Sequence, residues 1–121
     1  MNKTDRRFEN LYIWNEARRL VNSIYSMMNE SHDWGFKEQI QRAAVSIMNN
    51  IAEGAESGSD IKYRYFLNVA RGSCSEVRSM LYLCEDLNLC TKEHADNLRI
   101  MTRQISSGIV NLISSINTNT K

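Results

Sequence analysis

The sequence predicts an all-α protein, an antiparallel bundle of four helices in a single domain spanning residues 1–121. The chain has 121 residues, which is the length of one domain. It contains no proline and only five glycines, so few residues interrupt a long helix. Apolar residues recur every three or four positions in four stretches, and the loops between them are short, which favours antiparallel neighbours.

The first two helices are expected at residues 11–29 and 36–53. Each has one apolar face, formed by Trp14, Ala17, Val21, Ile24 and Met28 in the first and by Phe36, Ile40, Ala43, Ala44, Ile47 and Ile51 in the second. Ser31, His32 and Asp33 offer turn and capping groups between them. Gly54 is expected to end the second helix as a left-handed C-cap.

The last two helices are expected at residues 61–87 and 92–116, with Ser59 or Asp60 as the N-cap of the third, Asn88 as its C-terminal cap and Thr91 opening the fourth. The tail 117–121 is expected to fray. The third helix carries two apolar stripes, namely Phe66, Ala70, Cys74, Val77, Leu81 and Cys84, and beside them Tyr65, Val69, Met80, Leu83 and Leu87. One helix of an isolated bundle needs a narrower stripe, so the second one implies either central burial of this helix or a partner, and self-association is the prediction.

A polar seam is expected between the second and third helices. Its members are Gln39, Arg42, Ser46, Asn49, Asn50 and Glu53 on one side of the second helix, with Ser73 and Glu76 on the third. This set is either a solvated face or a hydrogen-bonded seam against another helix or another subunit. An ion pair between Glu76 and an arginine such as Arg42 is one hypothesis for how that carboxylate is compensated.

Catalysis is not predicted, and neither a cofactor nor a metal ion is expected. His32 falls in a predicted loop and His94 at a helix start, and no H-E-x-x-H, P-loop or G-x-G-x-x-G motif is present. Cys74, Cys84 and Cys90 form no C-x-x-C pair and are interpreted as free thiols of a reducing cytoplasm. A cryptic enzyme or small-ligand bundle is a remote alternative that requires a buried pocket lined by Glu76 and His94.

Neither membrane insertion nor a strong bias toward nucleic acid is predicted. We expect a cytoplasmic protein, because no apolar leader and no run of about 18 apolar residues is visible. The net charge is only +1, whereas nucleic-acid domains usually carry a clear basic excess. A modest basic set remains as a candidate nucleic-acid surface, interleaved with Tyr63 and Tyr65, and the alternative is ordinary solubility charge. Its members are Arg6, Arg7, Arg18, Arg19, Lys62, Arg64 and Arg71.

The second helix also carries a run that resembles a known family. The matching residues are Gln39 to Ile47 and Asn50 to Gly54, with further matches at Trp14, Ala17, Phe66, Leu67, Ala70 to Ser73 and Glu76. These residues resemble the bacterial four-helix-bundle proteins encoded in intervening sequences of 23S rRNA genes, which are often labelled ribosomal-protein-like. Many relatives have Pro-Ser where this chain has Met48-Asn49, so the second helix is expected to be straighter here.

The resemblance implies a bundle that assembles as a homopentamer, that is, a cyclic oligomer, and that has no catalytic residues. It also points to a related branch, the accessory proteins of diversity-generating retroelements, which bind nucleic acid and a reverse transcriptase. The resulting expectation is a non-enzymatic oligomeric scaffold or accessory protein. Its candidate partners are further copies of itself and RNA, a ribonucleoprotein or a nucleic-acid-processing protein. Direct nucleic-acid binding through the basic set is the alternative function.

Overall fold

The computed structural model of the chain describes the backbone of residues 6–119 and the side chains of residues 6–116. A short 3-10 helix, η1 (Phe8–Asn10), precedes four α-helices: α1 (Tyr12–Met28), α2 (Trp34–Ala55), α3 (Asp60–Asp86) and α4 (Lys92–Asn119). The fold class predicted from the sequence is therefore confirmed, and every predicted helix is present. The helix η1 was not predicted, and α4 continues three residues into the tail that was expected to fray.

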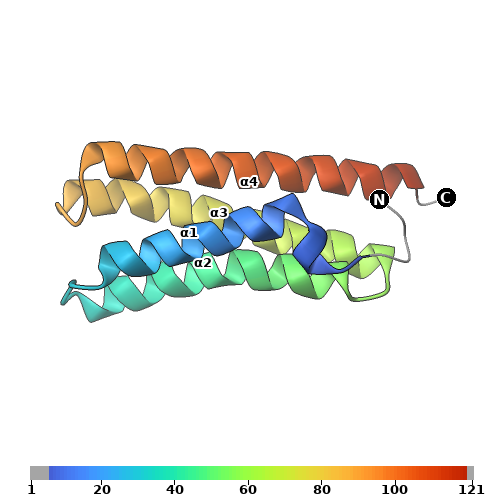
Figure 1. Cartoon of the computed structure of the whole chain (residues 1–121), viewed down its shortest axis with the longest axis horizontal. Helices are drawn as coiled ribbons and strands as arrows, with labels where there is room; N and C mark the ends of the chain where they lie inside the picture. Colours follow the sequence, from blue (N-terminus) through green and yellow to red (C-terminus); the bar gives the residue numbers. More distant parts are fainter. Residues whose placement is uncertain (1–5, 120–121) are drawn as a thin grey trace.

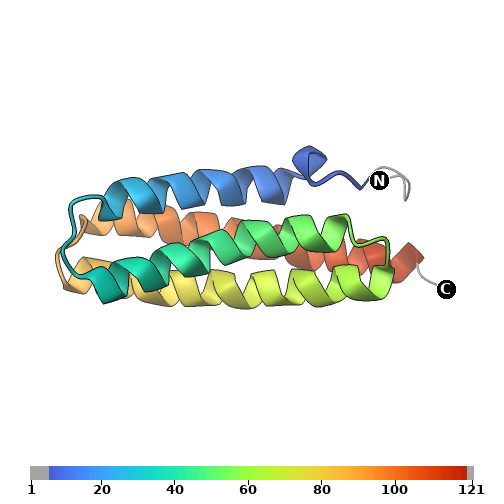
Figure 2. The ribbon, with the colours of Figure 1, turned by 90° about the horizontal axis from the view of Figure 1, so that it is seen from below.

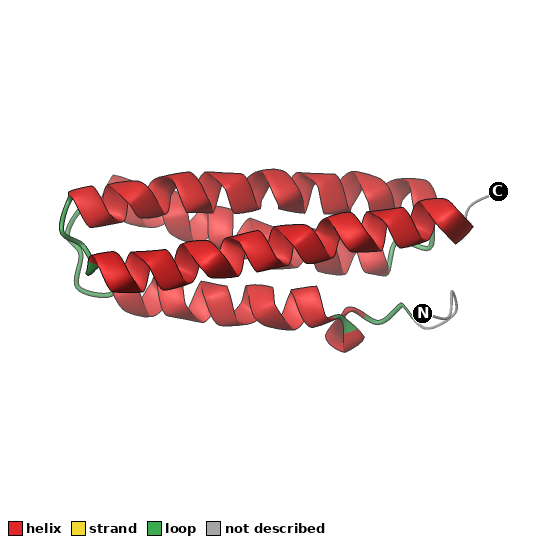
Figure 3. Cartoon of the chain, turned by 90° about the horizontal axis from the view of Figure 1, so that it is seen from above, coloured by secondary structure: helices red, strands yellow, loops and turns green. Residues whose placement is uncertain are grey.

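The four helices run alternately up and down and form a square bundle (Figures 1 and 2). α1 packs against α2 and α4, and α3 packs against the same two helices. Within the described residues, no Cα atoms of α1 and α3, or of α2 and α4, lie within 8 Å of each other, so these pairs occupy opposite corners. Seen from above, the connections are short turns at the two ends of the bundle (Figure 3). No helix in the described part of the chain is long and apolar enough to cross a membrane.

The core is formed mainly by the predicted apolar faces, but Ile13, Leu20 and Leu67, which the sequence assigned to none of these faces, are also buried. Ile24, Ile40, Ile47 and Leu81 are fully buried, whereas Trp14, Val21 and Phe36 are packed against the core but partly exposed. The second stripe of α3 behaves differently, because of its five members only Met80 is buried. This exposed stripe is the largest departure from the narrow apolar face that a helix of an isolated bundle needs.

Tyr63, which is interleaved in the sequence with the basic set proposed as a surface, does not lie at the surface. Its side chain is fully buried, and the largest effect on its hydroxyl is desolvation, which raises its pKa to about 12. The Arg6 guanidinium lies 5.1 Å from the centre of the Tyr63 ring and forms an ion pair with Asp60 at 2.8 Å. The Phe8 N–H also donates to Glu56 at 3.3 Å, so the segment around η1 is tied to the α2–α3 connection.

The helix ends follow the predicted capping groups with one exception. Asp33 accepts a hydrogen bond from the Phe36 N–H, and Ser59 accepts one from the Lys62 N–H. At the end of α3, Asn88 adopts a φ of 58°, and the Leu89 N–H donates to the Cys84 carbonyl at 2.8 Å. This is the 6→1 bond of a Schellman motif.

The exception is Gly54, for which the predicted C-cap role is wrong. α2 continues through Gly54 to Ala55, and the left-handed backbone belongs to Gly58, with a φ of 75°. Gly54 is buried where α2 meets α3. A methyl group there would lie 2.9 Å from the Phe66 Cβ and 3.2 Å from the Tyr63 ring. Gly54 is therefore needed for close helix packing rather than for a turn.

Replacing Gly54 with alanine tests this interpretation. The added Cβ has to push α3 away because the Phe66 Cβ is fixed to its backbone, and overpacking of this kind costs about 1–3 kcal/mol of unfolding free energy. Gly72→Ala is the matched control, because it lies mid-helix on α3 with no atom within 4 Å of its new Cβ. It is expected to stabilise the bundle by about 0.5–1 kcal/mol. Urea unfolding of both variants measures the difference, and equal effects would contradict the packing role of Gly54.

Candidate functional site

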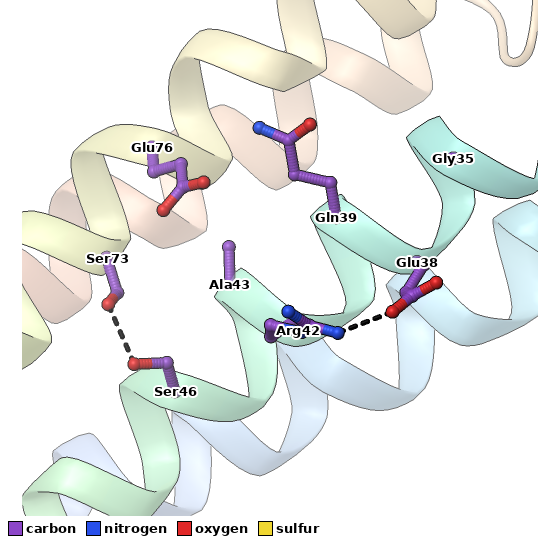
Figure 4. A pocket seen from close by; sticks show the side chains of 8 residues that line it. All are labelled: Gly35, Glu38, Gln39, Arg42, Ala43, Ser46, Ser73 and Glu76. Carbon is purple, nitrogen blue, oxygen red and sulfur yellow. Dashed lines mark hydrogen bonds and ion pairs between the residues drawn. The ribbon is translucent and has the colours of Figure 1, made fainter.

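An open cleft between α2 and α3 collects most of the predicted polar seam (Figure 4). Its volume is about 510 Å³. The seam residues in its lining are Gln39, Arg42, Ser46, Ser73 and Glu76, joined by Gly35, Glu38 and Ala43. The sequence therefore predicted five of the residues that the fold brings together here. The small residues Gly35 and Ala43 leave space between the longer side chains, which is what makes this stretch of the surface concave.

A short polar network links the two helices at one end of the cleft. The Ser46 and Ser73 hydroxyls lie 2.9 Å apart, in hydrogen-bonding distance across the helix pair (Figure 4). The Asn50 side-chain amide donates to the Ser46 carbonyl at 2.8 Å and to its hydroxyl at 3.0 Å. All three side chains are partly buried. Of the alternatives offered by the sequence, this part of the seam is therefore hydrogen-bonded to another helix of the same chain.

The predicted ion pair between Glu76 and Arg42 is not formed. Arg42 instead pairs with Glu38, one turn earlier on the same helix (Figure 4). The i, i+4 spacing brings these two exposed side chains together without crossing the cleft. Glu76 lies on the α3 side, with Ala43 between it and Arg42. The Glu38–Arg42 spacing was visible in the sequence and was the signal that identifies the correct partner.

The two remaining seam residues lie away from the cleft. Asn49 is exposed on α2. Glu53 lines a second, mainly apolar hollow near the α2–α3 turn, together with Ser57, Ile61, Lys62, Tyr65 and Phe66. The α2–α3 face thus consists of a polar cleft in its middle and an apolar hollow toward the turn.

The seven residues of the predicted basic set do not share one face. Arg18 and Arg19 lie on α1, whereas Lys62, Arg64 and Arg71 lie on α3 at the opposite corner of the bundle. Several are engaged locally: Arg19 pairs with Glu16 at 3.0 Å, and Arg18 lies 5.8 Å from the Trp14 ring centre. Arg6 is held by Asp60, and Arg7 and Arg64 also have interaction partners. The set is therefore distributed charge rather than a single patch.

The described residues assemble no recognisable catalytic group. Glu76 lines the α2–α3 cleft, whereas His94 is exposed in the first turn of α4, so the two do not share a pocket. His94 is held there by its backbone, whose N–H donates to the Thr91 hydroxyl at 3.1 Å. Within residues 6–119, no cluster of three or more histidine, cysteine, aspartate or glutamate residues could hold a metal ion.

One buried charged group was missed by sequence reasoning. Arg99 on α4 is only 6% exposed, and it pairs with Glu85 of α3 at 3.0 Å and with Asp96. It also donates to the Leu81 carbonyl and covers the Tyr82 ring at 4.1 Å from its centre. This cluster joins α3 to α4 near their connecting turn, and its two carboxylates compensate the charge of Arg99.

The Ser46–Ser73 bond is expected to couple α2 to α3 energetically. A double-mutant cycle of Ser46→Ala and Ser73→Ala should give a coupling of about 0.5–1.5 kcal/mol, the usual net contribution of a partly buried hydrogen bond. Ser75→Ala is the control, because Ser75 is exposed on α3 and should change stability by less than about 0.5 kcal/mol. Thermal or urea unfolding of the four proteins measures the coupling. Strict additivity would mean that the two hydroxyls do not interact.

Two of the three thiols are expected to be unreactive in the folded protein. Burial raises the pKa of Cys74 and of Cys84 to about 12. At pH 8 only about one part in ten thousand of such a thiol is ionised, and the thiolate is the reactive form. Alkylation followed by mass spectrometry should therefore modify both residues only after unfolding. Rapid labelling of Cys74 in the native protein would contradict its placement in the core.

Comparisons with known proteins agree with this architecture. A protein with unknown function from the S23 ribosomal protein family of Bacteroides thetaiotaomicron has a crystal structure that superposes with a TM-score of 0.74. It is 24% identical, and the match covers 84% of this chain and 97% of that one, which shows a common fold. No curated protein matches. The family profile of the 23S rRNA-intervening sequence protein matches residues 9–111, and the chain belongs to this family.

Proposed function

We propose that this protein is a non-enzymatic scaffold that assembles with further copies of itself through its α2–α3 face. The observation that carries the proposal is the apolar stripe left exposed on α3. Tyr65 is 63% exposed, Leu83 47% and Leu87 50%, and Val69 is also exposed. These side chains form two exposed apolar pairs, Tyr65 with Val69 and Leu83 with Leu87, about 21 Å apart along α3. Exposed apolar groups of this kind are typical of subunit interfaces.

The stripe has the spacing of a helix-packing seam. Its four exposed members and Glu76 follow one another at intervals of four and seven residues, so positions 65, 69, 76, 83 and 87 lie along one side of α3. Glu76, at the centre of this row, is not part of the apolar stripe but a carboxylate that borders the polar cleft. A single polar residue in an otherwise apolar seam fixes the register and the number of packed helices at some cost in stability. Glu76 is suited to this role in an assembled form.

A ring of five copies is the assembly that the family resemblance implies. A ring needs two different complementary surfaces on each chain, so the α2–α3 face would meet another face of the next copy. The name of the family refers to intervening sequences of 23S rRNA. It supports extending the proposal to an accessory role for RNA or a ribonucleoprotein. Such a ring would also repeat any weak binding surface several times, which raises the overall avidity.

Light scattering coupled to size exclusion tests the assembly directly. Five copies of the 14.0 kDa chain would give a particle of about 70 kDa at micromolar concentration. Leu83→Glu places a charge in the proposed seam and should release monomers. It should cost the monomer less than about 0.5 kcal/mol, because the position is exposed within the bundle.

Ile100→Glu is the matched control for this variant. Ile100 is an exposed apolar residue of similar size on α4, which does not contact α2 in the described chain. It should leave the mass unchanged, and a fall in mass would instead place the second face of the ring on α4. A sharp 14.0 kDa species for the unaltered protein would eliminate the scaffold proposal. An assembly that Leu83→Glu leaves intact would move the interface away from the α2–α3 face.

A further inference from the structure

A second groove lies between α3 and α4, away from the α2–α3 cleft. It has a volume of about 440 Å³ and is lined by Arg78, Arg103, Ser106, Ser107, Val110 and Asn111. Two guanidinium groups, two hydroxyls and an amide therefore border one concave surface. Neither Arg78 nor Arg103 belonged to the basic set predicted from the sequence, because they lie on different helices and only the fold brings them together.

The two arginines of this groove have no carboxylate partner, unlike four other arginines of the described chain. Within the described residues, Arg78 and Arg103 form no ion pair, whereas Arg6, Arg19 and Arg42 each form one and Arg99 forms two. The surrounding sequence explains the difference. Residues 77–84 of α3 and residues 97–116 of α4 contain no aspartate or glutamate. The positive charge of the groove is therefore uncompensated along both helices that form it.

The row of arginines continues along α3. Arg64, Arg71 and Arg78 recur at intervals of seven residues, so they lie on one side of the helix, about 10 Å apart. Arg71 is exposed and, like Arg78, forms no ion pair in the described chain. A single phosphate ion cannot span two such positions. A polymer with regularly spaced phosphates can, and guanidinium groups bind phosphate oxygens in a bidentate manner.

An aromatic side chain stands beside the same groove. A neighbouring hollow shares Arg103, Ser107 and Asn111 with it and adds Tyr12 of α1, whose side chain is 63% exposed. Cations that follow a backbone, together with an exposed aromatic ring on which a base can stack, are the two components of single-strand binding surfaces. A base inside a duplex is already stacked and cannot use such a ring.

We propose that the α3–α4 groove binds the phosphate backbone of a single-stranded nucleic acid, with Arg71, Arg78 and Arg103 contacting phosphates and Tyr12 stacking on a base. Arg103 links the two parts, because it borders both hollows. The neutral donors Ser106, Ser107 and Asn111 provide further hydrogen bonds to phosphate or sugar oxygens. The site is separate from the α2–α3 face, so assembly and strand binding depend on different residues.

Fluorescence anisotropy with labelled 20-nucleotide strands tests the proposal. The probes are single-stranded RNA, single-stranded DNA of the same sequence and the corresponding DNA duplex. Three phosphate contacts give a salt slope of about −2 for a single strand, so raising the salt from about 50 to 200 mM should weaken binding about 20-fold. Binding that is equal for RNA and DNA indicates backbone contacts alone, and a preference for RNA indicates contact with the 2′-hydroxyl. Both results support the groove.

Variants distinguish binding by the groove residues from non-specific attraction to positive charge elsewhere on the protein. The double variant Arg78→Ala with Arg103→Ala should weaken binding more than tenfold and reduce the salt slope to about −0.7. The matched control, Lys37→Ala with Lys92→Ala, removes the same charge from α2, where Lys37 lies over the Trp34 ring, and from the first turn of α4, where Lys92 pairs with Asp96. It should leave the slope unchanged. Tyr12→Ala should weaken single-strand binding at least fivefold at constant slope, whereas Tyr12→Phe, which keeps the ring, should not.

Four outcomes would overturn the proposal. The first is the absence of binding to all three probes at low salt, and the second is an equal loss of affinity in the groove variant and the control variant. The third is tighter binding to the duplex than to either single strand. The fourth is a fall in particle mass in the Arg78→Ala, Arg103→Ala variant. The last outcome would make the groove a subunit interface. Circular dichroism melting of each variant checks that the bundle is folded. Arg103→Ala alone tests the same groove with the least risk to folding, because Arg103 is exposed on α4.

Discussion

The close packing of α2 against α3 is the constraint on which the rest of the molecule depends. Gly54 allows the two helices to approach because no side chain separates it from Phe66 and Tyr63. Further along, Ser46 and Ser73 are near enough to share a hydrogen bond. The polar cleft lies along this same contact, with Ser46 and Ser73 in its lining.

Much of the fold was predictable because it depends on local patterns. Periodicity located all four helices, and the capping roles of Asp33, Ser59, Thr91 and Asn88 follow from short-range backbone chemistry. Errors arose where tertiary contacts override local preference. Gly54 has the composition of a cap, but its missing side chain serves a helix crossing. Tyr63 stands among charged residues in the sequence and yet is fully buried, under the guanidinium of a residue 57 positions earlier.

The candidate site was predictable in part for the same reason. Helical spacing correctly grouped Gln39, Arg42, Ser46, Ser73 and Glu76, because each lies on the facing sides of two helices that are adjacent in the sequence. The pairing of Arg42 with Glu38 was missed although it requires only the i, i+4 rule. The groove of Arg78 and Arg103 could not be derived in this way, since it depends on how α3 and α4 align side by side. Sequence proximity had favoured Arg18 and Arg19, which lie at another corner.

The up-and-down order of the helices has a consequence for how the chain reaches its native state. Three of the four helix contacts join neighbours in the sequence, and only the contact of α1 with α4 closes over nearly the whole chain. Topologies dominated by such local contacts fold in about microseconds to milliseconds. Each helical hairpin can form without waiting for distant parts of the chain, because its contacts lie close together in the sequence. The outer stripe of α3 differs from the inner one in that neither α2 nor α4 covers most of it even in the finished bundle.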